Sequence, residues 1–284
     1  MYAGNRPFGP VPLDFGTENG YIILQLFFNP FTPGARRMER IMYQMENEVP
    51  FTRTGADGRL KLHEAVAMMM DCCQFQEYQE QTFCRYLREN NLAVFLFSIQ
   101  LDVIRLPRFR EKVRTAVKIY GCKSIYGLRR ITMRDESGEL CIISNATGAF
   151  FDVAAGRAAK IDPAVFGVVY DEAEPMECLP RKIPVPTGGG APMPVFTVKP
   201  SDLDGNGHLT SPLYFAIASD VLPADFAWNR VRAEFKKQAK PGETVHPVLH
   251  LAPGGAAVVD LQGDDGVSFA VTEFTSADLG SPSR

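Results

Sequence analysis

The spacing of apolar positions along the first half of the chain predicts one helix among several strands. From residue 60 to about residue 87 apolar side chains recur close to every 3.6 residues, which predicts one long helix. A strand is predicted before it, at 42–51, and a turn at 55–58, where Asp57-Gly58 tolerates a positive φ. After the helix, strands are predicted at 93–105, 112–121, 124–134 and 139–152. Because strand follows strand through short turns, we expect an antiparallel sheet.

The same order of elements returns in the second half. Residues 195–199 predict a strand, 202–210 a loop, and 211–222 a helix with Pro212 in its first turn. Further strands are predicted at about 226–238, 243–252, 255–262 and 266–275. In detail, Asp57-Gly58-Arg59-Leu60 corresponds to Asn206-Gly207-His208-Leu209. We therefore predict an α+β fold of two tandem units, each a long helix packed on a curved antiparallel sheet, an arrangement called the hotdog fold.

Four segments follow from this pattern. Residues 1–37 are rich in Gly and Pro and lack the features of a targeting signal, so we expect a flexible arm. A start codon assigned too early, with the working protein beginning at Met38 or Met42, is the alternative. Residues 38–170 and 195–284 are the predicted hotdog units, and 171–194, dense in Pro and Gly, is the linker between them.

Composition and charge exclude several classes of protein. The chain has 284 residues, of which 45% are hydrophobic, so it can form a sizeable core and is not a disordered polar chain. With 30 basic and 33 acidic residues the net charge is −3, which argues against a nucleic-acid-binding protein. The longest apolar run near the start is too short to span a membrane. The six cysteines form no C-x-x-C pair, so we expect no structural zinc and reduced, mostly buried thiols in the cytoplasm.

The candidate chemistry lies at residues 202–208, between a predicted strand and a predicted helix. Asp202, Asp204, Asn206 and His208 bring carboxylate, amide and imidazole together. A carboxylate can accept a proton from water, an imidazole can move one, and an amide can hold a carbonyl or a water. Backbone N–H groups at the start of the following helix could polarise a carbonyl oxygen.

Three simpler interpretations compete for this loop. It could be an ordinary turn, because Asp, Asn and Gly are turn residues. It could be a calcium loop, but the chelating Glu expected at its twelfth position is Leu213. His208 could also be a structural histidine. In the first unit Gly55 stands in place of Asp204 and Arg59 in place of His208. A turn needs neither group, so their presence in one unit favours a function there.

The loop resembles the catalytic segment of the plant and bacterial acyl-acyl carrier protein (acyl-ACP) thioesterases, whose pattern is S-D-x-D-x-N-x-H-x-N-N. The matching residues are Ser201, Asp202, Asp204, Asn206 and His208, whereas Thr210 and Ser211 replace the final Asn pair. Further agreement, over roughly residues 38–275, comes from Leu106-Pro107 with Glu111, Arg129-Arg130, Ser137-Gly138-Glu139 and the stretch from Lys237-Gln238 to Gly242.

The resemblance implies a thioesterase that hydrolyses acyl-ACP to a free fatty acid and the carrier protein. It implies that the first unit holds the acyl chain and that the second holds the reaction centre, and it implies no cofactor or metal. The implied catalytic residues are Asp204, Asn206, His208 and Gln238, where the family has Glu. The implied partner is acyl carrier protein, and the chain is expected to be a monomer or a homodimer.

Two alternative functions remain open at this stage. One is an acyl-coenzyme A thioesterase or a hydratase on the same fold. The other is a non-catalytic acyl-binding protein, which Gln238 allows because an amide cannot act as a base.

Weaker signals also have two interpretations each. The histidines His246 and His250 are a remote candidate for a metal site, and Met68-Met69-Met70 is expected to pack in the core or to line an acyl chain. Two basic runs are expected to be solvated strand faces or to dock an acidic partner: Arg105, Arg108, Arg110, Lys112 and Arg114, and Arg230, Arg232, Lys236, Lys237 and Lys240.

Overall fold

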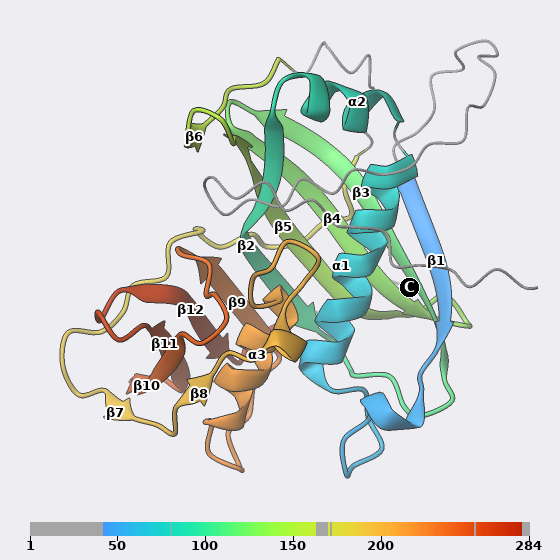
Figure 1. The fold of residues 1–284 in the computed structure, drawn as a ribbon. Coiled ribbons are helices and arrows are strands. Elements are labelled where there is room, and N and C mark those ends of the chain that lie inside the picture. Colours follow the sequence, from blue (N-terminus) through green and yellow to red (C-terminus); the bar gives the residue numbers. More distant parts are fainter. Residues whose placement is uncertain (1–41, 80, 163–169, 171, 253, 280–284) are drawn as a thin grey trace, which may run out of the picture.

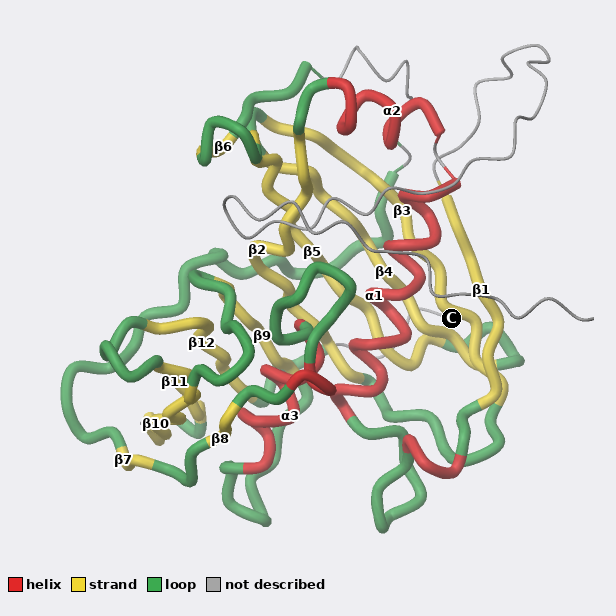
Figure 2. Tube along the Cα trace, viewed as in Figure 1, coloured by secondary structure: helices red, strands yellow, loops and turns green. Residues whose placement is uncertain are grey.

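The computed structural model describes residues 42–79, 81–162, 170, 172–252 and 254–279. The predicted arm at 1–37 lies outside the described residues. Within those ranges the chain forms one large antiparallel sheet with helices on it (Figures 1 and 2). None of the described helices has both the length and the apolar content needed to cross a bilayer.

Most strands agree closely with the predicted ones, and the two-residue strands at 157–158 and 191–192 lie outside the predicted set. The alternation typical of a half-buried sheet is clearest in the first strand, Met42–Glu48. In the first half they are β1 (Met42–Glu48), β2 (Leu92–Val103), β3 (Lys112–Lys123), β4 (Tyr126–Asp135), β5 (Leu140–Asp152) and the short β6 (Arg157–Ala158). In the second half they are β7 (Ala191–Pro192), β8 (Phe196–Thr197), β9 (Arg230–Phe235), β10 (Thr244–Ala252), β11 (Ala256–Gln262) and β12 (Ser268–Thr275).

The spatial order of the strands in the second half is the mirror image of the order in the first half. The first half runs β1-β3-β4-β5-β2 and the second half β9-β12-β11-β10, with β8 paired to β10. The two halves join where β2 pairs antiparallel with β9, from Ser98 opposite Glu234 to Asp102 opposite Arg230. All recorded strand pairs are antiparallel, as predicted.

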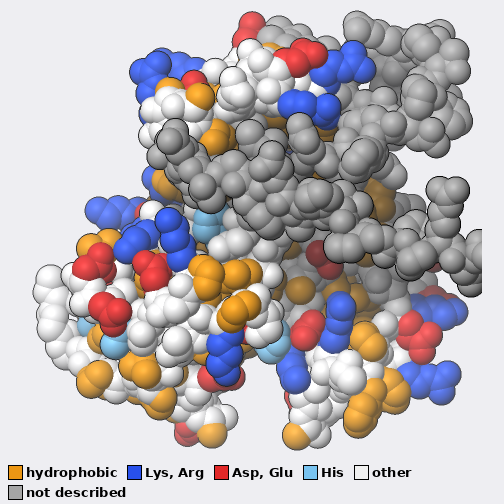
Figure 3. All heavy atoms as spheres, viewed as in Figure 1, with side chains coloured by type: hydrophobic (Ala, Val, Ile, Leu, Met, Phe, Trp, Pro, Cys, Tyr) orange, Lys and Arg blue, Asp and Glu red, His pale blue; other side chains and the backbone are white. Residues whose placement is uncertain are grey.

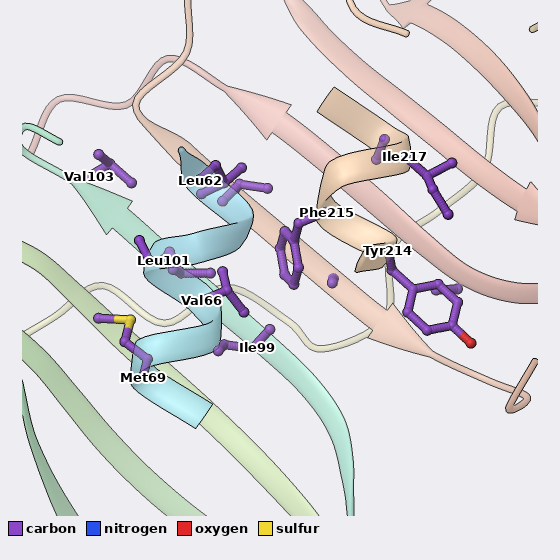
Figure 4. Packing of buried hydrophobic residues seen from close by; sticks show 14 of the residues in the cluster. Leu62, Val66, Met69, Ile99, Leu101, Val103, Tyr214, Phe215 and Ile217 are labelled. Atoms are coloured by element: carbon purple, nitrogen blue, oxygen red, sulfur yellow. The ribbon is translucent and has the colours of Figure 1, made fainter. Parts of the chain in front are cut away.

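Two helices cover one face of the sheet and form the core with it. These are α1 (Leu62–Gln79) and α3 (Ser211–Asp220). Phe215 of α3 points toward Val66 of α1, and both pack over Ile99 of β2 (Figure 4). The core is therefore continuous across the junction between the two halves. Met68 and Met69 are buried in it, so the prediction that they pack in the core is confirmed.

The prediction of one continuous helix from residue 60 to about 87 is wrong, because this segment forms two helices. After α1 the chain forms a separate helix, α2 (Gln81–Glu89), which lies across the end of the sheet (Figure 1). The last buried residue of α1 is Gln76, so the helix has no further core to cover. In α2 Phe83 instead packs edge-on against Phe150 of β5, with ring centroids 6.2 Å apart. Tertiary packing thus redirects a segment whose local pattern is helical throughout.

The linker is not a free spacer, because residues 174–183 pack along the opposite face of the sheet. Arg232 Nη1 donates to the Pro180 carbonyl at 2.7 Å, and the Ile183 N–H donates to Glu234 Oε2 at 3.1 Å. The interpretation of the second basic run as a solvated face is therefore wrong for Arg230 and Arg232. Both are buried because the linker covers the strand face to which they belong.

Candidate active site

The loop before α3 is a tight turn organised by the Asp204 carboxylate. Oδ1 of Asp204 accepts from the backbone N–H of Asn206 at 2.8 Å and of His208 at 3.3 Å. The Asp204 N–H donates to the His208 carbonyl at 2.8 Å, and Gly207 takes a φ of 76°. Asp204 therefore has the turn role that the simpler interpretation assigns to it. Its second carboxylate oxygen makes no hydrogen bond to the described residues.

The corresponding loop of the first half has the same backbone turn. The Gly55 N–H donates to the Arg59 carbonyl at 2.8 Å, and Gly58 takes a φ of 73°. The expectation that this turn does without a carboxylate is wrong, because Asp57 Oδ1 accepts from the Arg59 N–H at 3.0 Å. The two loops therefore differ in two respects: the carboxylate is Asp57 in the first and lies two positions earlier, at Asp204, in the second, and only the second contains a histidine, His208.

The His208 side chain is the buried member of the candidate set. Its residue is only 6% exposed, while Asp204 and Asn206 are exposed. Burial lowers the pKa of His208 below its ordinary value of 6.5, an effect that the nearby Asp204 charge opposes and the Lys240 charge reinforces. The imidazole is therefore neutral at pH 7 and can accept a proton.

The segment that contains Gln238 lies beside this loop. The Leu209 N–H donates to the Ala239 carbonyl at 2.9 Å, which ties the residue after His208 to the residue after Gln238. From the other side the Ala239 N–H donates to the Tyr214 hydroxyl of α3 at 3.1 Å. Burial raises the pKa of Tyr214 to about 12, so the hydroxyl stays protonated.

The tertiary structure thus brings the segment of Gln238 to the loop of Asp204, Asn206 and His208, although Gln238 is distant from these three in sequence. The side chains of Asn206, His208 and Gln238 make no hydrogen bond to one another among the described residues. Sequence analysis missed Tyr214, which fixes the backbone next to Gln238. The sequence offered one indication of its role, because a tyrosine on the buried face of a predicted helix needs a hydrogen-bond partner for its hydroxyl.

The two histidines that were a remote metal-site candidate lie outside the one cluster of metal-ligating side chains found among the described residues. No group of three metal-ligating side chains includes His246 or His250 within the part of the chain that the structure describes. One such group does occur, formed by Glu111, Asp135 and Cys141. Its two carboxylates already bind the Arg105 guanidinium, with Nη1 at 3.0 Å from Glu111 Oε2 and Nη2 at 2.6 Å from Asp135 Oδ2. The cluster is therefore an ion-pair network in which one guanidinium binds both carboxylates.

Comparison with known families gives a match to the first half of the chain. Residues 40–168 match the model of the acyl-ACP thioesterase N-terminal domain. The resemblance to the acyl-ACP thioesterase family is confirmed. The match covers the first unit together with its helix and indicates a thioester hydrolase. No curated protein sequence matches the chain.

Solved structures of acyl-ACP thioesterases share the hotdog fold with this chain over most of its length. An acyl-ACP thioesterase from Bacteroides thetaiotaomicron superposes with a TM-score of 0.75 at 17% identity, covering 82% of this chain and 97% of its own. A putative oleoyl thioesterase from Lactobacillus plantarum gives 0.72 at 19%, covering 83% and 95%. A 12:0-ACP thioesterase from Umbellularia californica gives 0.71 at 14%, covering 84% and 98%.

The buried imidazole predicts the acid limb of the pH–rate profile. If neutral His208 is required, thioesterase activity should fall only below pH 6.5, because the pKa of His208 is lowered. Lys240→Ala removes a cation that lowers this pKa, so the acid limb should move to higher pH. Lys236→Ala, an exposed cation on the same segment, is the control. If the acid limb keeps the same pH midpoint in Lys240→Ala, the titration of His208 does not cause it.

Proposed function

We propose that the protein hydrolyses acyl-ACP to a free fatty acid and the carrier protein. The observation that carries this proposal is the match of residues 40–168 to the acyl-ACP thioesterase N-terminal domain. The loop chemistry supports it, because a carboxylate and a neutral imidazole occur together in the second unit. In the first unit the equivalent turn carries Gly55 and Arg59 at those places.

We infer that the chain is two tandem hotdog units. The mirrored strand order on either side of the β2–β9 junction supports this division, as does the equivalence of the two turns. The first unit, 38–170, would hold the acyl chain against α1. The second, 195–284, would hold the thioester near the start of α3.

The proposed reaction uses groups that lie at this place. Asp204 accepts a proton from water through its unengaged oxygen, and the water oxygen attacks the thioester carbonyl carbon. The backbone N–H groups that start α3 stabilise the charge that develops on the carbonyl oxygen. His208 takes up this proton from Asp204 and passes it to the leaving sulfur as the carbon–sulfur bond breaks, so both side chains return to their starting state. Asn206 and Gln238 orient the water and the substrate.

The partner is proposed to be acyl carrier protein, which is acidic. Figure 3 shows basic and acidic side chains interspersed over the described part of one face, so any attraction must be local. Near the loop, Lys236 and Lys240 are exposed and form no ion pair with the described residues. Lys237 is engaged by Asp265 at 3.4 Å. A cytoplasmic monomer or homodimer remains the prediction.

Turnover of the purified protein on matched acyl-ACP and acyl-coenzyme A substrates tests the proposal. We expect hydrolysis of acyl-ACP at a higher kcat/KM than of the coenzyme A thioester with the same acyl group. Preference for coenzyme A would favour the acyl-coenzyme A thioesterase. Tight binding without turnover on either substrate would favour the acyl-binding protein.

Replacing Gln238 with glutamate tests its role directly. If Gln238 orients water while Asp204 is the base, Gln238→Glu should change kcat only modestly. If residue 238 must be the base, the same change should raise kcat about tenfold or more, about 1.4 kcal/mol of barrier. We expect the modest change, measured as steady-state kcat on one acyl-ACP. A large gain over a nearly inactive natural protein would overturn the water-orienting role.

A further inference from the structure

A buried arginine of the first half has no carboxylate partner among the described residues. Arg130 of β4 is only 5% exposed, and within the described part of the chain its Nε has no hydrogen-bond partner. The carboxylates of the linker segment that covers this side of the sheet pair elsewhere, Glu174 with Lys118 at 2.9 Å and Glu177 with Arg230 at 2.7 Å. Burying a cation without a counter-ion is costly, so the position favours an anion beside it.

The groups that the guanidinium of Arg130 reaches are two sulfur atoms of the linker and one aromatic ring. Nη1 donates to Met176 Sδ, and Nη2 donates to Cys178 Sγ at 3.7 Å. The Cζ atom lies 5.4 Å from the centre of the Tyr120 ring. A thioether carries no charge, and burial raises the pKa of Tyr120 above its ordinary value of 10. Of these three groups, the thiol of Cys178 is therefore the one that can supply an anion near neutral pH.

A buried glutamine holds Cys178 in this place from both sides. Gln100 of β2 is 5% exposed. Its Nε2 donates to the Glu177 carbonyl at 2.8 Å, and its Oε1 accepts from the Leu179 N–H at 2.9 Å. The backbone before and after Cys178 is thus fixed to the sheet. The contact between the sulfur and Arg130 is therefore built into the fold.

Cys178 also differs from the other cysteines in its access to solvent. Of the six cysteines, all of which lie within the described ranges, it is the only exposed one. Burial raises the pKa of Cys72 to about 12 and the pKa values of Cys73 and Cys141 to about 11, and it also raises the pKa of Cys122. The thiolate is the reactive form of cysteine. A reagent from solution therefore meets one accessible thiol, and that thiol lies beside a cation.

We propose that Cys178 is a modification site at which a peroxide oxidises the thiolate to a sulfenic acid, and that Arg130 is the positioning residue that stabilises the thiolate. The sulfur attacks one peroxide oxygen and the O–O bond breaks. The second oxygen leaves as hydroxide and takes a proton from solvent to become water. The sulfur is oxidised by two electrons and the peroxide is reduced by the same two. This site does not depend on the proposed hydrolysis of acyl-ACP.

Hydrogen peroxide, with dimedone as the trap for sulfenic acid and peptide mass spectrometry as the readout, tests the site in the full chain. In the natural protein Cys178 should be labelled about tenfold faster than any other cysteine. Arg130→Met should lower the rate at Cys178 about tenfold, because an opposite charge this close favours the thiolate. Arg130→Lys retains a cation and should restore most of the rate. Arg134→Met is the control on the same strand, where the guanidinium donates to the Gly138 carbonyl at 3.0 Å, and should keep the natural rate.

Two further measurements keep the test decisive if Arg130→Met does not fold. The natural protein should be labelled at Cys178 about tenfold faster than N-acetylcysteine at the same pH, since the free thiol has no cation beside it. Cys178→Ser should lose the label while keeping the natural Tm. Equal labelling of several cysteines, a rate no greater than that of N-acetylcysteine, or an unchanged rate in folded Arg130→Met would overturn the site.

Discussion

Replacing Asp204 with asparagine is expected to lower kcat about a thousandfold without unfolding the protein. The natural carboxylate accepts the N–H groups of Asn206 and His208 through Oδ1, and an asparagine oxygen can accept the same two bonds. The turn therefore persists, while the carboxylate that we propose as the acceptor of the water proton is lost. A general base typically contributes a factor of about 10² to 10⁴. Steady-state kcat on acyl-ACP, with circular dichroism and Tm as fold checks, measures the effect.

The first unit supplies a matched control for this substitution. Asp57 caps the equivalent turn by accepting the Arg59 N–H at 3.0 Å, and we assign it no chemistry. Asp57→Asn makes the same chemical change in the same kind of turn and should leave kcat unchanged. If Asp204→Asn kept natural activity, Asp204 would be a turn residue only.

Replacing Arg230 alone with methionine should destabilise the protein by about 3–5 kcal/mol. The Arg230 guanidinium binds Asp102 in a bidentate pair, at 2.6 and 2.8 Å, and donates to Glu177 of the linker at 2.7 Å. The side chains of Arg230 and Asp102 are 6% and 7% exposed. Removing the cation leaves the Asp102 charge buried at the junction of β2 and β9. Urea unfolding measures the free energy.

Two controls separate the buried charge from the loss of a contact. The double variant Asp102→Leu with Arg230→Met removes both charges, and it should recover most of the lost stability. Arg114→Met breaks the exposed pair with Glu46, at 2.8 Å, and should cost about 0–1 kcal/mol. If Arg230→Met lowered the free energy of unfolding by no more than Arg114→Met does, the pair between Arg230 and Asp102 would not be buried at the junction.

Much of the fold follows from local pattern. The strands other than the two-residue β6 and β7 were predictable, because the pattern of apolar residues and turn residues is a property of consecutive positions. The turns at 55–58 and 204–208 were predictable because Gly58 and Gly207 supply the positive φ that these turns require. Asp204, Asn206 and His208 could be singled out because they lie within five residues of one another.

The sequence by itself thus determined the strands, the turns and the chemical identity of the loop, because those depend on neighbouring residues. Only the tertiary structure decided where the helix after residue 60 divides, because the second part packs against the sheet through the contact between the rings of Phe83 and Phe150. It also decided that Arg230 is buried, because the linker covers a strand face that composition alone presents as basic and solvated. Contacts between residues distant in sequence likewise place Gln238 beside the loop, through the hydrogen bond from Leu209 to Ala239.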